Sequence, residues 1–144
     1  MLYKITQNSA FLFTLMFLFS LLAVSCSKKV RFEGSNVVPA AEGYARIKKD
    51  ENKNYSIEVN IVNLASSERL QPPKNAYVVW ITTKNSGVKN TGQLKSSTGF
   101  FSKALEGNLN AVSPFKPTQV FITAEDAANV QYPGPFRVLQ TDPF

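Results

Sequence analysis

The stretch NYSIEVNIVNL, residues 54–64, is the strongest indication of the fold class, because it has the clearest alternation in the chain. Its apolar side chains fall on every second residue and share one face: Tyr55, Ile57, Val59 and Ile61. A period of two with a single apolar face is typical of a half-buried β-strand. The preceding stretch GYARIKKD, residues 43–50, alternates in the same way, and the polar stretch DENKN separates the two. This order predicts an antiparallel β-hairpin.

Working outward, the stretch AYVVWITT, residues 76–83, is continuously apolar, β-branched and aromatic. Such a run is typical of a central strand covered on both faces. Further short strands are expected at four places: around Leu94, over residues 99–105, over 119–125 and over 136–141. Proline or glycine stands at most corners, and only residues 124–130 suggest a helical turn. We therefore expect residues 37–144 to form one all-β domain, an immunoglobulin-like antiparallel sandwich of about seven strands.

The N-terminal residues have the pattern of a secretory signal. Lys4 is the only charge before an apolar run over residues 11–24. As a helix, that run would reach about 21 Å, which is short of the ~30 Å hydrocarbon core of a bilayer. A basic start, a short apolar run and small residues before a cut predict a signal peptide over residues 1–25.

The only cysteine, Cys26, follows that run directly. The sequence LAVSC, residues 22–26, resembles a bacterial lipobox, although Ala23 and Ser25 are not the commonest residues at their positions. The resemblance implies cleavage between Ser25 and Cys26 and attachment of a diacylglyceryl group to the thiol. Two or three fatty-acid chains, such as palmitate, would anchor the protein stably. The alternative is a plain cleaved signal that leaves Cys26 as an incidental thiol.

Residues 26–36 are polar and predict a lipidated tether between the anchor and the domain. Lys28, Lys29 and Arg31 would either lie against anionic headgroups or be solvated. The residue after the cysteine is Ser27 rather than an aspartate that would retain the protein in the inner membrane. We therefore expect an address in the bacterial envelope, at the outer membrane facing the periplasm.

The charge of the chain does not favour nucleic-acid binding. Sixteen Lys and Arg against ten Asp and Glu give a formal charge of +6, which becomes +5 once Lys4 is removed with the signal. The basic residues are dispersed and form no dense stripe with interleaved aromatic residues. The expected partners are the membrane, through the lipid anchor, and another envelope protein, but no nucleic acid.

The last two-thirds of the chain resembles the extracytoplasmic β-domain of anti-sigma-K factors. The matching features, in order, are Tyr77 to Trp80, Gly87, Gly92 with Leu94, Val120 to Glu125, and Pro133-Gly134 before Val138-Leu139. The resemblance implies the fold and a role outside the cytoplasm. The sigma-binding domain of that family, often with His and Cys zinc ligands, has no counterpart here, so sigma-factor sequestration is not implied.

Few residues could carry catalytic chemistry. The chain has no histidine, which excludes Ser-His-Asp and Cys-His catalysis and the common His-based zinc sites. Two adjacent acid pairs remain, Asp50-Glu51 and Glu125-Asp126. Both are interpreted as solvated turn residues, with weak calcium binding at Glu125-Asp126 as the alternative. We expect no enzymatic activity, no cofactor and no metal.

The aromatic residues leave two interpretations open. Trp80 and Tyr77 are tentative ligand contacts, as a stacking platform for a sugar or peptide, or else core residues. Phe100, Phe101 and Phe115 lie near turns and could mark a contact surface, or pack in the core. The predicted function is a non-enzymatic, lipid-anchored binding or accessory module in envelope signalling or assembly. The alternative is a β-sandwich lipoprotein that binds a small ligand or a glycan.

Overall fold

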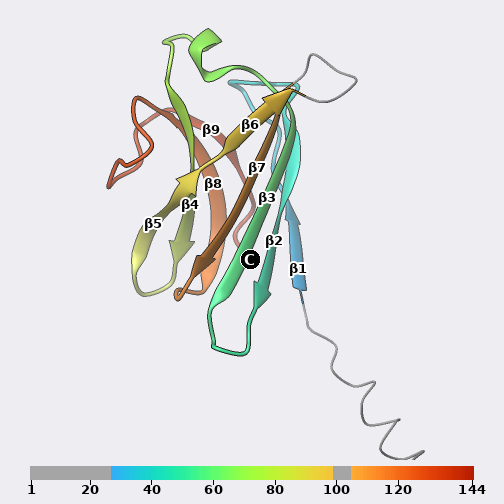
Figure 1. Cartoon of the computed structure of the whole chain (residues 1–144), viewed down its shortest axis with the longest axis vertical. Helices are drawn as coiled ribbons and strands as arrows, with labels where there is room; N and C mark the ends of the chain where they lie inside the picture. Colours follow the sequence, from blue (N-terminus) through green and yellow to red (C-terminus); the bar gives the residue numbers. More distant parts are fainter. Residues whose placement is uncertain (1–26, 99–104) are drawn as a thin grey trace, which may run out of the picture.

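The computed structural model describes residues 27–98 and 105–144 and shows an all-β architecture (Figure 1). Within these residues there are nine strands and one short 3-10 helix, η1 (Ser67–Arg69). The strands are β1 (Ser27–Arg31), β2 (Glu42–Lys49), β3 (Tyr55–Leu64), β4 (Ala76–Thr83), β5 (Gly87–Gln93), β6 (Lys95–Thr98), β7 (Leu105–Ser113), β8 (Pro117–Glu125) and β9 (Arg137–Gln140). The predicted signal peptide, and with it any signal helix, lies outside the described residues.

The strands form two antiparallel sheets that share one core. The five-stranded sheet has the order β1-β2-β3-β7-β6, and the four-stranded sheet has the order β5-β4-β8-β9. The main core takes side chains from both sheets, including Val59 and Ile61 of β3 and Val79 and Ile122 of the other sheet. The inner faces of the two sheets therefore pack against each other in a sandwich-like arrangement.

The hairpin predicted from residues 43–64 is confirmed. β2 and β3 pair antiparallel in an unbroken register from Glu42 opposite Val62 to Lys49 opposite Tyr55. At the turn, the Asp50 carboxylate accepts a hydrogen bond of 2.7 Å from the Asn54 backbone N–H. Ile57, Val59 and Ile61 are almost completely buried, as the alternation predicted.

The prediction for residues 76–83 is also confirmed, because β4 is a central strand buried on both faces. Tyr77, Val79 and Ile81 belong to the main core between the sheets. Ala76, Val78 and Trp80 form a second cluster with Phe121, on the outer face of the four-stranded sheet. Ala128 and Val130, from the segment between β8 and β9, cover that cluster.

Two local predictions differ from the structure. The strand expected around Leu94 is two strands in different sheets, because the chain crosses from one sheet to the other at this residue. Gly92, with φ +129°, provides the backbone conformation for that crossing. Residues 124–125 end β8, and residues 126–130 form a bend and a turn instead of a helical turn. Most of the strand expected over residues 99–105 lies outside the described residues.

The expected tether over residues 26–36 is wrong for its described part. Residues 27–31 form β1, which pairs with β2 over five positions, and Phe32 makes a bridge to Thr141 beyond β9. The polar composition is explained by position, because β1 is an edge strand and its Lys28, Lys29 and Arg31 are exposed. Val30 packs against the core instead.

One end of the molecule gathers the start of β1 and three chain reversals, and we call it the N-terminal pole (Figure 1). It carries Ser27, the turn at 50–54 between β2 and β3, the turn at 84–86, and the turn at 114–116. The register places all of these at the same ends of their sheets, because Tyr55 pairs with Ser113 and Thr83 pairs with Pro117. The C-terminal Phe144 also reaches this pole, where its N–H donates to the Thr118 carbonyl.

Candidate functional site

The two aromatic residues predicted as tentative ligand contacts are core residues, so that prediction is wrong. Trp80 is 0% exposed, and its indole N–H donates a hydrogen bond of 2.8 Å to the Thr123 hydroxyl. Tyr77 is 4% exposed, and its hydroxyl donates to the Ala65 carbonyl at 2.9 Å. Both rings are covered because β4 lies at the centre of its sheet, with a protein layer on each face.

Burial also changes the acidity of one of these residues. Removal of the Tyr77 side chain from water raises the pKa of its hydroxyl from 10.0 to about 12. The phenol therefore stays protonated and acts as a hydrogen-bond donor throughout the physiological range. It ties β4 to the segment that follows β3.

The other aromatic candidates divide between exposed and undescribed positions. Phe115, in the turn between β7 and β8, is 37% exposed, and the Lys89 ammonium lies 5.3 Å from its ring centroid. Phe100 and Phe101 lie outside the described residues. Tyr132, which the sequence did not single out, is the most exposed aromatic residue described, at 81%.

Glu125 and Asp126 were interpreted as a solvated pair, but their side chains have different environments. Glu125 is buried and accepts hydrogen bonds from the Thr123 hydroxyl at 2.5 Å and from the Gly134 backbone N–H at 2.7 Å. Asp126 is exposed and pairs with Lys74 at 2.9 Å. The interpretation is correct for Asp126 and wrong for Glu125, because Glu125 ends β8 on the covered face it shares with Thr123, whereas Asp126 lies in the bend beyond the strand.

Together these contacts form a buried polar relay on the outer face of the four-stranded sheet. The Trp80 N–H donates to Thr123, the Thr123 hydroxyl donates to Glu125, and the Gly134 N–H donates to the same carboxylate oxygen. Asn90 secures the covering segment by donating to the carbonyls of Ala128 and Val130. The relay joins β4, β8 and the segment before β9, which gives Glu125 a structural role.

The calcium alternative at Glu125-Asp126 gains no support from the geometry. The Asp126 carboxylate is occupied by Lys74, and the Glu125 carboxylate by its two donors. Among residues 27–98 and 105–144, no group of three His, Cys, Asp or Glu side chains is placed to hold a metal ion.

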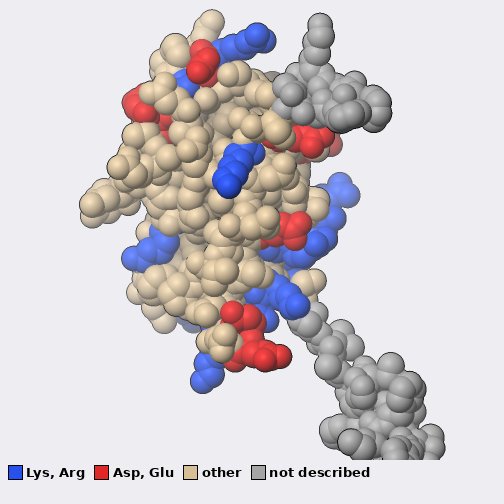
Figure 2. Space-filling view, viewed as in Figure 1, with Lys and Arg blue, Asp and Glu red and all other residues tan. Residues whose placement is uncertain are grey.

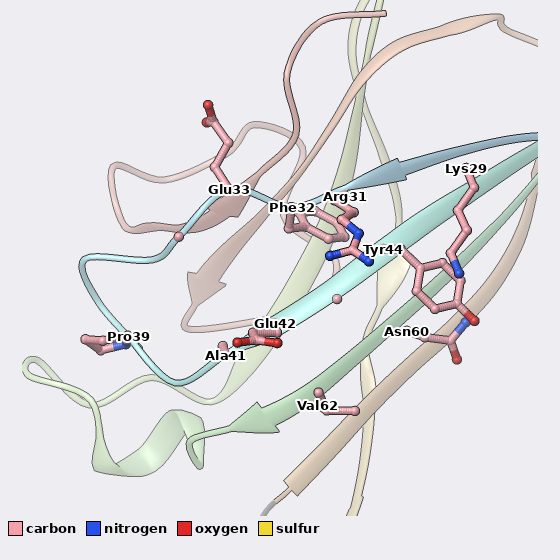
Figure 3. Close-up of a pocket in the computed structure, with 12 residues that line it drawn as sticks. Lys29, Arg31, Phe32, Glu33, Pro39, Ala41, Glu42, Tyr44, Asn60 and Val62 are labelled. Atoms are coloured by element: carbon pink, nitrogen blue, oxygen red, sulfur yellow. The ribbon is translucent and has the colours of Figure 1, made fainter.

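A pocket of about 490 Å³, lined by both polar and apolar residues, lies along β1 and β2, on the side away from the core (Figure 3). We call it the β1–β2 groove. Tyr44 lies toward one end of it, with the Lys29 ammonium 3.8 Å from the Tyr44 ring centroid, and Asn60 and Val62 of β3 border it. Arg31, Glu33 and Glu42 place charges of both signs around it. Such a surface suits a polar or mixed-charge partner more than an apolar one.

A second pocket, of about 500 Å³, opens at the N-terminal pole. Its lining combines the side chains of Lys28, Lys49 and Lys116 with the apolar surfaces of Ile47, Tyr55, Pro117 and Phe144. We call it the lysine pocket. The sequence did not reveal it, because its residues come from β1, β2, β3, the turn before β8, the start of β8 and the C-terminus, which only the fold brings together.

Charge is distributed unevenly between the two ends of the molecule. The N-terminal pole carries Lys28, Lys48, Lys49, Lys53, Lys84 and Lys116 against Asp50, Glu51 and Asp142. The opposite end carries the exposed acids Glu33, Glu42, Glu68, Glu106 and Asp126 against Arg31, Arg69, Lys74 and Arg137. Basic side chains are visible close to residue 27, where the described chain begins (Figure 2).

The predicted lipidation and cleavage residues, Cys26 and Ser25, lie outside the described residues. The structure nonetheless places their neighbour, because Ser27 is the first residue of β1. Within residues 27–98 and 105–144, no helix is long and apolar enough to cross a bilayer.

Comparison with known proteins adds no assignment. No protein-family model, curated protein or solved structure matched the chain. The likeness to anti-sigma-K factors therefore remains a resemblance of short motifs.

Proposed function

We propose that the protein is a lipid-anchored, non-enzymatic module of the bacterial cell envelope that binds a partner in signalling or assembly. The observation that carries the proposal is the junction at residue 26. The lipobox-like LAVSC ends at Cys26, and β1 begins at the next residue. An acylated Cys26 would hold the N-terminal pole directly at a membrane surface, which for a chain with Ser27 is the outer membrane facing the periplasm.

Labelling tests the anchor. The full chain is expressed in a bacterial host supplied with an alkyne-labelled fatty acid, and the label on the protein is measured after membrane fractionation. We expect label on the chain, and its complete loss in Cys26→Ala. Label that persists in Cys26→Ala, or an unlabelled chain in the soluble fraction, would contradict the anchor.

We propose the β1–β2 groove as the partner surface, because it includes Phe32, Glu33 and Glu42, which lie toward the end opposite the proposed anchor. A photo-crosslinking residue at Val62, which lines the groove, should capture a discrete envelope protein in intact cells. Val112 is the matched control, since it is an exposed valine on neighbouring β7, outside the groove. Identical products from both positions, or none from Val62, would contradict this surface.

The glycan-binding alternative is not proposed for Trp80 and Tyr77, because both are buried. The proposed absence of enzymatic activity rests on the lack of histidine and on the structural role of Glu125. Hydrolysis of ester, peptide or glycosidic model substrates by the purified chain, lost on heating, would contradict it.

We also propose that the sandwich follows the immunoglobulin plan. In that plan strands A, B, E and D form one sheet and C, F and G the other, and some members add C′ beside C. The observed orders β2-β3-β7-β6 and β5-β4-β8-β9 correspond to A-B-E-D and C′-C-F-G, with β1 as an added edge strand. Trp80 departs from the plan, since it packs outside the four-stranded sheet instead of between the sheets. Cross-strand contacts measured by NMR, above all between β3 and β7, test the assignment.

A further inference from the structure

The lysine pocket is a cavity that the proposed partner surface does not use, since the two share no lining residue. Ile47 and Pro117 form buried parts of its lining, and Tyr55 and Phe144 are partly buried and pack against the main core. The apolar lining is therefore held by the sandwich itself. Its volume of about 500 Å³ lies within the range of sites that take small ligands.

The rim of the pocket is cationic. Lys28, Lys49 and Lys116 come from three separate parts of the chain, and no Asp or Glu is among the residues that line it. In the described part of the chain the ion pairs are Arg46–Glu58 and Lys74–Asp126, so neither takes up a lysine of the pocket. Three ammonium groups around one opening form a strongly anion-attracting site.

Two of these ammonium groups already lie over aromatic rings of the pocket. Lys28 Nζ is 5.0 Å from the Phe144 ring centroid, and Lys49 Nζ is 6.0 Å from the Tyr55 ring centroid. Both distances are within the range over which an ammonium group is attracted to an aromatic ring. Apolar walls below a cationic rim match a phosphate group attached to an apolar body.

The pocket also includes Ser27, the residue that follows Cys26. A lipid on Cys26 would therefore place the mouth of the pocket at the height of the phospholipid headgroups. The negative charge of an anionic headgroup complements the cationic rim. The apolar part of the same lipid can contact the apolar lining.

We propose that the lysine pocket binds the phosphate of an anionic phospholipid headgroup in the membrane that holds the chain. This inference rests on the proposed lipid anchor. If so, the domain binds lipid headgroups with its N-terminal pole against the membrane surface, and it does not move freely on a tether.

The test uses the full chain in nonionic detergent micelles, with its lysines ¹³C-dimethylated so that each ammonium keeps its charge and gives an NMR signal. Phosphatidylglycerol, phosphatidylcholine or inorganic phosphate is then titrated in. We expect saturable shifts at Lys28, Lys49 and Lys116 with phosphatidylglycerol, and none with the other two probes.

A pair of triple variants measures how much the pocket contributes. K28Q/K49Q/K116Q removes the rim, and K48Q/K89Q/K95Q removes the same charge from outside the pocket. A lysine at an anionic surface changes binding about fivefold, so the rim variant should bind phosphatidylglycerol roughly 100-fold more weakly. The control should lose less than tenfold. Unchanged tryptophan emission from Trp80 in both variants shows that the fold is intact.

Three results would overturn the proposal. Equal shifts at all lysines, or equal losses in the two triple variants, would mean a diffuse charge effect without a pocket. Saturable shifts with inorganic phosphate at the same concentration would assign the pocket to a free anion instead of a lipid. Failure of the anchor is recognised separately, because the fatty-acid label on Cys26 is measured independently of the lysine shifts.

Discussion

At the scale of single residues, Thr123 is the link on which the buried polar relay depends. Its hydroxyl accepts from the Trp80 indole and donates to the Glu125 carboxylate. Glu125 is 7% exposed, and a carboxylate at that depth requires hydrogen-bond donors. The Gly134 N–H supplies the second donor, and a side chain at position 134 would crowd the Glu125 oxygens.

Thr123→Val should therefore destabilise the protein by about 2–3 kcal/mol, because it leaves the Trp80 N–H without its acceptor and removes a donor from a charged group. Thr91→Val is the matched control, since the Thr91 hydroxyl makes one hydrogen bond to the Val79 carbonyl, and should cost about 1 kcal/mol. Urea unfolding followed by Trp80 fluorescence measures both. Equal losses would show that the relay has no special contribution.

The raised pKa of Tyr77 predicts that the free energy of unfolding depends on pH in the alkaline range. Its pKa is about 12 in the folded protein and near 10 in the unfolded chain, so the unfolded chain loses the proton first. The contribution is fully present below pH 10 and is lost as the pH rises through 12. The free energy of unfolding should fall by about 2–3 kcal/mol across that window because of this group.

Urea unfolding at pH 9, 10, 11 and 12 checks this expectation. Tyr77→Phe should flatten the fall and lower stability at neutral pH by about 1 kcal/mol, because the hydrogen bond to the Ala65 carbonyl is lost. Tyr132→Phe is the exposed control and should keep the full slope. An unchanged slope in Tyr77→Phe would contradict the assignment.

At the scale of elements, β2 and β3 approach each other unusually closely at Gly43. A Cβ at this position would overlap the Asn60 carbonyl oxygen and lie 3.0 Å from the Ile61 Cα. Both are backbone atoms of β3, so they can move only if the strand moves. Gly43 thus sets the spacing of the hairpin beside the β1–β2 groove.

Gly43→Ala should destabilise the protein by about 3 kcal/mol, because the added methyl group forces the two strands apart. Gly34→Ala is the matched control, since nothing lies within 4 Å of a Cβ at position 34, and it should change stability by less than about 0.5 kcal/mol. Thermal unfolding followed by circular dichroism compares them. A Gly43→Ala protein as stable as the control would show that β3 adjusts without cost.

At the scale of the whole molecule, the uneven charge gives the domain a preferred orientation. The lysines of the N-terminal pole would face an anionic membrane, and the exposed acids at the other end would be repelled from it. With Cys26 acylated, its thiol is consumed, so a cysteine introduced elsewhere can carry a nitroxide label alone.

We expect a label at Phe115→Cys, in a turn of the N-terminal pole, to collide mainly with oxygen dissolved in the lipid. A label at Tyr132→Cys, between β8 and β9, should collide mainly with a water-soluble nickel chelate. Electron paramagnetic resonance on the lipidated chain in vesicles containing phosphatidylglycerol measures the two accessibilities. Equal accessibilities would contradict a fixed orientation, and 1 M salt should reduce the difference.

The alternation of residues 54–64 and the apolar run of residues 76–83 predicted β3 and β4 correctly, because period and composition are local properties of a strand. β7 was missed, since its inward positions include Gly107, where a Cβ would meet the Leu94 side chain. Only the paired neighbours β3 and β6 make such a segment a strand. β1 was also not predicted, because most side chains of this edge strand are polar and exposed, so its sequence shows no apolar alternation.

Local sequence patterns were sufficient to predict the all-β class, the β2–β3 hairpin and the central position of β4. They could not predict that Trp80 and Tyr77 are buried, that Glu125 is buried while Asp126 is exposed, or that three distant lysines line one pocket. The physical reason is that burial and charge clustering depend on which distant segments become neighbours in the two sheets. A local sequence pattern does not specify those neighbours.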